Sequence, residues 1–288
     1  LSTRYGDCLM PEIITVDVKE LKRKKIMKDT LFSPLLVEKV REALSRGEQA
    51  ILFQNRRGFA PMIECRGCGW VPHCVNCDVS LTYHKAHNQL VCHYCGYTYR
   101  LPQVCPECKG TEFKMQGFGT EKVEEEIAGQ FPVAKVERLD FDTARTRTAY
   151  ERIISDFEKG KTQILIGTQM LSKGLDFGNV SVVGILSADS LMNFPDFRAH
   201  ERAYQLMVQV SGRAGRRDKR GTVILQTTQP EHPLIRMVQH FAYKEMVSLQ
   251  LSERSMFRYP PYYRLIVLIL RSRNEEALQE MSALYAEK

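Results

Sequence analysis

Four C-x-x-C pairs between residues 65 and 108 are the feature that most constrains the fold of this chain. They use eight of its nine cysteines, and the pairs are Cys65/Cys68, Cys74/Cys77, Cys92/Cys95 and Cys105/Cys108. Two thiolates from one tight turn can bind a tetrahedral Zn²⁺, and a second such turn completes the site. Four pairs therefore predict two zinc ions.

The separations between the pairs favour a nested grouping. The 14 residues between Cys77 and Cys92 fit a zinc-ribbon hairpin, whereas the five after Cys68 leave little chain for two turns to face one ion. We therefore expect two metal sites: Cys65, Cys68, Cys105 and Cys108 on one zinc, and Cys74, Cys77, Cys92 and Cys95 on the other. Sequential pairing of the turns is the alternative.

Closed sites with four thiolates have no open position for water, so both zinc ions are expected to be structural. A disulfide framework is the alternative, but the chain does not open with a secretory signal, and cytosolic thiols are kept reduced. The histidines of this segment are not expected to be ligands, because eight thiolates already fill two tetrahedra. Catalytic chemistry must then lie outside the cysteine-rich segment.

The segments around the cysteines alternate between helix and strand patterns. Helices are expected at 31–47, 121–131, 147–160 and 198–215, and strands at 49–55, 133–140, 162–168, 180–189 and 221–227. Buried strands that alternate with helices of this length indicate a parallel sheet covered on both faces. We therefore predict an α/β domain with a cysteine-rich module inserted after its first strand.

A tempting nucleotide motif, Gly160-Lys161-Thr162, does not fit a phosphate-binding loop. Such a loop follows a strand and opens a helix, with a glycine five residues before the final one. Here the motif ends a predicted helix, and Ser155 occupies the first glycine position. The chain also has no D-E-x-[HD] motif that could hold Mg²⁺.

Two other segments carry residues suited to phosphate chemistry. The turn after a buried strand contains Thr168, Gly174 and Asp176, and a later helix that runs into a glycine contains Gln209, Gly212, Arg213 and Arg216. Because the two arginines are three residues apart, we expect them to share one helix face. Two guanidinium groups together can bind a γ-phosphate and stabilise charge as it transfers. A basic helix end favoured by the helix dipole is the alternative.

The positive charge of the chain is clustered. The net charge is +7; residues 19–28 carry six basic side chains against one acid, and residues 213–220 carry five against one. Such clusters suit a polyanion such as nucleic acid, and a solvated surface is the alternative. No apolar stretch is long enough to span a bilayer, so we expect a cytoplasmic protein without a membrane partner.

The phosphate-binding segments resemble motifs V and VI of superfamily 2 helicases: "GTQMLSKGLDF" (167–177) and "QVSGRAGR" (209–216). Together with "FQNRRGFAP" (53–61) before the cysteines and "RYPPYYRL" (258–265), they resemble the primosomal protein N′ (PriA) family along nearly the whole chain. The resemblance implies a second RecA-like helicase lobe with an inserted two-zinc module and part of a C-terminal α+β domain. Residues 1–30 would be the tail of a first lobe and a linker, 31–64 and 109–229 the second lobe, 65–108 the zinc module, and 230–288 the start of the C-terminal domain.

The function implied by this resemblance is that of a bacterial ATP-dependent 3′ to 5′ DNA helicase. It would recognise and remodel stalled forks and D-loops for replication restart and primosome assembly. Its implied partners are forked and single-stranded DNA, primosome proteins, single-strand-binding protein and factors that load the replicative helicase. ATP and Mg²⁺ would be cofactors of a longer protein. This piece lacks Walker A and B motifs and is expected to be inactive as an ATPase alone.

The resemblance also implies roles for individual residues. Arg213 and Arg216 would complete the ATP site from across the cleft between lobes, with Gly174, Asp176 and Gln209 also in ATP binding. Arg56, Arg57 and Thr168 would contact DNA, although a surface loop explains the two arginines equally well. Tyrosines interleaved with basic residues in the zinc module suit base stacking, or serve its folding. The alternative function is a non-catalytic zinc-ribbon adaptor that binds nucleic acid; a zinc-linked redox protein is a third.

Overall fold

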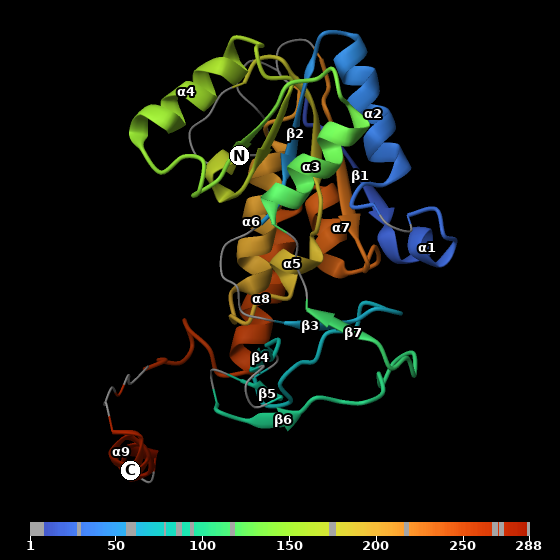
Figure 1. Ribbon diagram of the computed structural model, residues 1–288. Coiled ribbons are helices and arrows are strands. Elements are labelled where there is room, and N and C mark those ends of the chain that lie inside the picture. Colours follow the sequence, from blue (N-terminus) through green and yellow to red (C-terminus); the bar gives the residue numbers. More distant parts are fainter. Residues whose placement is uncertain are drawn as a thin grey trace. The chain divides into compact units, whose positions relative to one another are not determined.

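The computed structural model (Figure 1) describes residues 9–27, 30–55, 62–77, 79–84, 88–92, 95–115, 119–172, 177–215, 219–266, 270 and 274–286. The chain divides into two compact units, Leu1–Gln250 and Leu251–Lys288. The larger unit contains the sheet and all eight cysteines of the pairs. Among the described residues, no helix is long and apolar enough to cross a membrane.

Six strands of the larger unit form one sheet in the order β1-β11-β10-β2-β9-β8. They are β1 (Glu12–Asp17), β2 (Gln49–Phe53), β8 (Val136–Leu139), β9 (Ile164–Gly167), β10 (Val180–Ile185) and β11 (Thr222–Thr227). Every neighbouring pair is parallel. Two interior strands, "QAILF" of β2 and "ILIG" of β9, are buried at every residue. Apolar runs of this kind are expected where helices cover both faces of a parallel sheet.

Two separate hydrophobic clusters confirm that helices pack on both faces. One joins α2 (Pro34–Ser45) and α3 (Thr120–Gln130) to the sheet, through Leu36, Val40, Val123 and Ile127. The other joins α4 (Arg147–Glu158), α6 (Ala199–Ser211) and α7 (Pro233–Gln239) to the sheet, through Ile153, Phe157, Met207, Val210 and Leu234. These residues recur at helical spacing, which buries one stripe of each helix. The predicted α/β fold is therefore confirmed.

Helix starts follow from local capping. The Ser33 side chain accepts a hydrogen bond from the backbone N–H of Leu36, and Pro34 occupies the first helical position of α2. Thr146 caps α4 in the same way, accepting from the N–H of Ala149. Side-chain oxygens at these positions satisfy backbone donors that the helix leaves without partners.

The cysteine-rich module is inserted between β2 and α3. The chain passes into it through β3 (Ile63–Cys65) and returns through β7 (Phe113–Met115), and these two strands pair antiparallel. A three-stranded antiparallel sheet lies inside the module, formed by β4 (Thr82–His84), β5 (Gln89–Val91) and β6 (Thr98–Arg100).

The structure differs from the expected domain boundaries at both ends. Strand β1 pairs in register with β11 from Glu12↔Thr222 to Asp17↔Thr227, so residues 12–17 are the edge strand of this sheet and not a linker. A short helix, α1 (Val18–Arg23), follows β1.

The boundary expected at residue 230 is also wrong. Helix α7 and the first half of α8 (Tyr243–Met256) bury Leu234, Ile235, Val238 and Met246 in the core of the larger unit. The smaller unit begins at Leu251 and contains α9 (Glu275–Ala286). Residues 264–266 and 270 form no strand, and residues 267–269 lie outside the described residues.

Candidate metal centres and phosphate-binding residues

The structure brings the eight thiols together in the nested grouping that the spacing predicted. The sulfur atoms of Cys65, Cys68, Cys105 and Cys108 lie within 4.8 Å of one another, as do those of Cys74, Cys77, Cys92 and Cys95. Three sulfur pairs are separated by 3.5, 3.5 and 3.6 Å: Cys65/Cys108, Cys68/Cys105 and Cys74/Cys95. A tetrahedron with Zn–S bonds of about 2.3 Å has edges of about 3.8 Å. Both clusters therefore fit a zinc ion with four thiolate ligands.

The C-x-x-C turns share a backbone geometry that explains their sequence. The N–H of Cys65 donates to the carbonyl oxygen of Trp70 (2.8 Å), and the N–H of Gly69 donates to the carbonyl oxygen of Cys65 (2.9 Å). The same two bonds close the turns that begin at Cys92 and Cys105. The fourth residue after the first cysteine has a left-handed backbone, with φ of 76° at Gly69, 72° at Gly96 and 61° at Lys109. Glycine suits this position because it has no Cβ.

Within each cluster the four thiols differ in exposure and in pKa. The first cysteine of every pair is buried, whereas Cys95 and Cys108 are exposed. Burial raises the pKa of Cys68 to about 12. The backbone N–H of Gly110, followed by neighbouring thiols, lowers the pKa of Cys108 to about 7. Cys108 therefore ionises near neutral pH beside Cys68, whose thiol stays protonated until a cation stabilises the thiolate, which is the chemistry expected of a metal-dependent fold.

Among the described residues, no histidine belongs to these ligand sets. His73 Nε2 lies 3.4 Å from Ser80 Oγ. His87 and His93 lie outside the described residues, as does the side chain of His84.

Both four-cysteine clusters lie close to the parallel-sheet domain. Near the first, a Cβ placed on Gly69 would lie 2.8 Å from Thr228 Oγ1. Thr228 follows β11 and donates from its N–H and its hydroxyl to the carboxylate of Asp189 (2.9 Å each). Asp189 is 6% exposed and opens the short helix α5 (Asp189–Met192). At the second cluster, Phe197 packs against the apolar residues between its cysteines, which include Leu81 and Leu90.

Arg213 lies in a turn and not on the predicted helix. Helix α6 ends at Ser211, and the N–H of Arg213 donates to the carbonyl oxygen of Val210 (2.9 Å). The expectation that this arginine shares a helix face with Arg216 is therefore wrong for Arg213, and Arg216 lies outside the described residues. The Arg213 side chain is half-buried, and burial lowers its pKa.

Shortly after the end of α6, two glycines lie in close backbone contact. Gly215 has φ of 69°, and its N–H donates to the carbonyl oxygen of Val180 at the start of β10 (3.0 Å). A Cβ on Gly215 would lie only 2.0 Å from the backbone nitrogen of Gly221. Gly215 and Gly221 therefore meet backbone to backbone, in a contact that a side chain on Gly215 would prevent.

The other predicted site residues fall into two groups. Thr168 is buried directly after β9, and Gln209 is exposed on α6. Four lie outside the described residues: Arg56, Arg57, Gly174 and Asp176.

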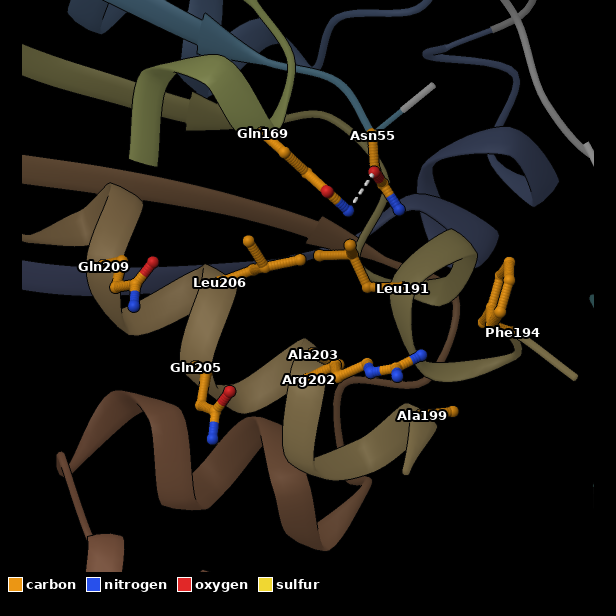
Figure 2. Close-up of a pocket in the computed structure, with 10 residues that line it drawn as sticks. All are labelled: Asn55, Gln169, Leu191, Phe194, Ala199, Arg202, Ala203, Gln205, Leu206 and Gln209. Carbon is orange, nitrogen blue, oxygen red and sulfur yellow. Dashed lines mark hydrogen bonds between the residues drawn. The ribbon is translucent and has the colours of Figure 1, made fainter. Parts of the chain in front are cut away.

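A pocket of about 350 Å³ lies where β2 and β9 end. It is lined by Asn55, Gln169, Leu191, Phe194, Ala199, Arg202, Ala203, Gln205, Leu206 and Gln209. Figure 2 shows Gln169 facing Asn55, and its Nε2 donates to Asn55 Oδ1 (3.2 Å). Across the pocket, Arg202 of α6 donates to Asp196 (2.6 Å). Open α/β sheets bind ligands at the carboxyl ends of their strands, so the position is typical of a binding site.

Of the residues that line this pocket, the sequence analysis had singled out Gln209 but not Asn55, Gln169 or Arg202. Asn55 and Gln169 each lie two residues after a buried strand. Polar side chains at that position could have indicated the pocket from the sequence, because the carboxyl ends of neighbouring parallel strands lie side by side.

Two known families match parts of the chain. Residues 74–100 match the family described as PriA DNA helicase Cys-rich region (CRR) domain. Residues 114–218 match the family described as helicase conserved C-terminal domain.

Curated proteins match almost the whole chain. The replication restart protein PriA of Bacillus subtilis is 44% identical over 283 residues, which are 98% of this chain and 35% of that protein. The PriA of Synechocystis sp. is 41% identical over 94% of this chain and 33% of its own length, and that of Haemophilus influenzae is 40% identical over 91% and 35%. The chain thus spans about a third of the length of these relatives. A solved structure of RecG bound to a three-way DNA junction is 12% identical over 99% of this chain and 26% of that one, with a TM-score of 0.46, a likeness too weak to carry an argument.

Proposed function

The chain belongs to the PriA family of replication restart proteins, and from this premise we propose that it forms the second motor lobe of an ATP-dependent 3′ to 5′ DNA helicase. The whole protein would recognise and remodel stalled forks and D-loops so that replication restarts. The observation that carries the proposal is the insertion of two nested four-cysteine clusters between β2 and α3 of a parallel sheet, in a chain 44% identical to a PriA over 98% of its length.

Arg213 is proposed to complete the ATP site from across a cleft between two lobes. Its guanidinium is half-buried, and removal from water strengthens its attraction to a phosphate. Arginine stays charged even when burial lowers its pKa, since its ordinary pKa is above about 12. Arg216, Gly174, Asp176 and Gln209 are proposed to act at the same site. The chain lacks a phosphate loop and an acidic Mg²⁺ motif, so a first lobe would supply them and this chain alone would hydrolyse almost no ATP.

The DNA track is proposed to follow the carboxyl ends of the strands. Thr168 follows β9, and Arg56 and Arg57 follow its neighbour β2, so the three lie after paired strands. The pocket between Asn55 and α6 opens at this same edge. Phosphate contacts at two neighbouring strand ends would fix the position of a single strand on the lobe.

The two zinc ions are proposed to be structural, tying each cluster of four thiolates into one rigid module. The partners proposed for the whole protein are forked and single-stranded DNA, primosome proteins, single-strand-binding protein and factors that load the replicative helicase.

Fork-stimulated ATP hydrolysis tests this proposal. The zinc-loaded chain is mixed with the N-terminal portion of the same protein, and turnover is compared with the full-length protein. We expect Arg213→Ala to reduce turnover by about 10³-fold or more, the range for an arginine that stabilises phosphoryl transfer. Arg152→Ala is the matched control, because Arg152 is an exposed arginine of α4 whose ion pairs are with Glu137 and Asp156, which have no part in the proposed site.

Three outcomes distinguish the motor-lobe proposal from its alternatives. If turnover depends on Arg213 in the mixture or in the full-length protein, the motor-lobe proposal stands. If both hydrolyse ATP equally well with Arg213→Ala, the arginine is misassigned. If neither the mixture nor the full-length protein hydrolyses ATP, a non-catalytic zinc-ribbon adaptor becomes the better description.

A further inference from the structure

One of the basic clusters in the sequence has no part in the proposed motor site. Residues 19–25, which we call the basic turn, include the end of α1 and the residues after it. Their basic side chains are Lys19, Lys22, Arg23, Lys24 and Lys25, and all five residues are exposed. The one acid of the turn, Glu20, forms an ion pair with Lys24 (2.6 Å). The turn therefore presents a net positive surface to solvent.

The basic turn is held firmly by the sheet. Strand β1 leads directly into α1, and Asp17 caps this helix by accepting from the N–H of Glu20 (2.9 Å). On the far side of the turn Met27 is only 2% exposed, and Val18 is buried as well. Apolar anchors on both sides fix the turn, so its lysines are not part of a loose tail.

The backbone of the basic turn has a conformation that favours glycine. Helix α1 ends in a Schellman motif, in which the N–H of Ile26 donates to Leu21 and the N–H of Lys25 donates to Lys22 (3.0 Å each). Lys25 occupies the left-handed position of this motif, with φ of 58°. Glycine is usual there, because it has no Cβ. The chain thus places an exposed cation at a position where stability favours glycine.

The position of the basic turn matches the proposed DNA track. Because all six strands are parallel, α1 follows β1 at the end of the sheet where β2 also ends (Figure 1). The pocket after β2 and β9 lies at the same carboxyl ends of the strands. Strand β1 is three positions from β2 in the sheet order, which corresponds to about 14 Å at about 4.8 Å per strand. Successive phosphates of one DNA strand are about 3.4 Å apart along the helix, so a few nucleotides cover this distance.

We propose that the basic turn binds the sugar-phosphate backbone of DNA at a position beyond the motor track. Four of its five cations are lysines, which act as point charges, and the turn contains no aromatic side chain for base stacking. Such a surface adds affinity without sequence preference, and the affinity falls steeply with salt. That the polyanion is DNA follows from the proposed function.

The test is the salt dependence of DNA binding by the zinc-loaded chain. The variant K19Q/R23Q/K25Q is compared with the original sequence on a fluorescent forked DNA, from low to physiological salt. Each lost phosphate contact should lower the slope of log affinity against log salt by about 0.7 for a single strand or about 0.9 for a duplex. We expect a slope smaller by about 2 and an affinity at least about tenfold lower near 100 mM salt.

A matched control removes the same charge from the opposite end of the sheet, where the strands begin. Lys135, Lys159 and Lys161 precede β8 and β9 and are at least partly exposed. The variant K135Q/K159Q/K161Q should keep the slope of the original sequence within about 0.5, since these lysines lie away from the strand ends that face the DNA. Equal decreases in the salt slope and in DNA affinity in both triple variants would overturn the proposal, because they would show a general effect of net charge.

Lys25→Gly separates binding from folding. Glycine relieves the left-handed backbone, so the urea midpoint of unfolding should rise while DNA affinity falls. A variant that is more stable and binds DNA as tightly as the original would overturn the proposal. The motor proposal has its own readout, the Arg213-dependent ATP turnover. An unchanged DNA affinity in K19Q/R23Q/K25Q would therefore leave that proposal intact, and tighter capture of an acidic protein than of DNA would assign the turn to a protein partner.

Discussion

Glu48 shows how a single buried carboxylate connects segments far apart in the chain. Its side chain is 8% exposed and accepts hydrogen bonds from Arg46 and Lys219 (2.9 Å each). Burial alone would raise the pKa of Glu48, but these cations outweigh it and lower the pKa to about 2. Lys219 lies just before β11 and Glu48 just before β2, so the ion pairs join the starts of two strands.

We expect Glu48→Gln to weaken the fold and to change its response to acid. A depressed carboxylate pKa stabilises the folded state above the unfolded value of 4.5, and this stability is lost as pH falls toward about 2. At pH 7 the substitution should lower the free energy of unfolding by about 1–2 kcal/mol, because both cations are largely exposed and screened. Urea unfolding at pH 7 and pH 3 measures this.

The difference between Glu48→Gln and the original sequence should shrink at pH 3. A difference that is equally large at both pH values would show that Glu48 acts through packing and not through its charge. Glu151→Gln serves as a control, because Glu151 is 59% exposed in its ion pair with Arg147, and it should change stability by less than about 0.5 kcal/mol.

The cysteine ligands could be predicted from the sequence, whereas the residues that lie near them in the fold could not. The spacing of eight cysteines identified both metal sets, since a short segment of chain determines each C-x-x-C turn. Asp189 and Thr228 were missed because their contact joins residues 39 positions apart and exists only in the folded sheet. The turn at Arg213 was missed because it depends on Gly215 and Gly221 meeting backbone to backbone.

At the scale of elements, the central strands were the easiest to predict. Strands β2, β9 and β10 are apolar runs because helices cover both of their faces. Strand β1 was assigned to a linker because its partner, β11, begins 210 residues later in the chain. Helix α7 was assigned to the next domain because its burial depends on the core of the first.

The cysteine module should depend on its metal while the sheet does not. Neither large core cluster contains a residue of the module, whereas Cys74 and Cys92 themselves form the centre of its small one. We therefore expect Cys92→Ser to lower the zinc content from two ions to one per chain and to expose residues 74–100 to protease. The sheet should keep its cooperative thermal transition. Metal analysis and limited proteolysis measure both effects.

Cys8→Ser is the matched control, because Cys8 belongs to none of the four pairs. It should retain two zinc ions and the original protease pattern. Loss of the sheet's cooperative transition in Cys92→Ser would show that the module is required for the fold of the whole unit.

At the scale of the larger unit, Phe197 of the sheet domain contacts the cluster formed by Cys74, Cys77, Cys92 and Cys95. It lies between α5 and α6 and packs against the apolar residues of the module. We expect Phe197→Ala to retain both zinc ions but to accelerate hydrogen exchange at Leu81 and Leu90, since the module would lose its apolar support. Hydrogen exchange detected by mass spectrometry measures this.

Phe141→Ala provides the comparison for that variant. Phe141 is 73% exposed, so its removal should leave exchange in the module unchanged. Unchanged exchange in Phe197→Ala as well would show that the metal cluster alone holds the module rigid.

The paired strands β3 and β7 have a consequence for how this chain can vary. They are antiparallel neighbours, with Ile63 opposite Met115, so the chain leaves the sheet domain and returns to it at a separation of about 5 Å. A tight hairpin turn could join them, and the geometry at their bases would be the same as with 47 intervening residues. The strand pairing therefore predicts that the module can be shortened, lengthened or exchanged between β3 and β7 while the chain still enters and leaves the sheet domain at the same two points.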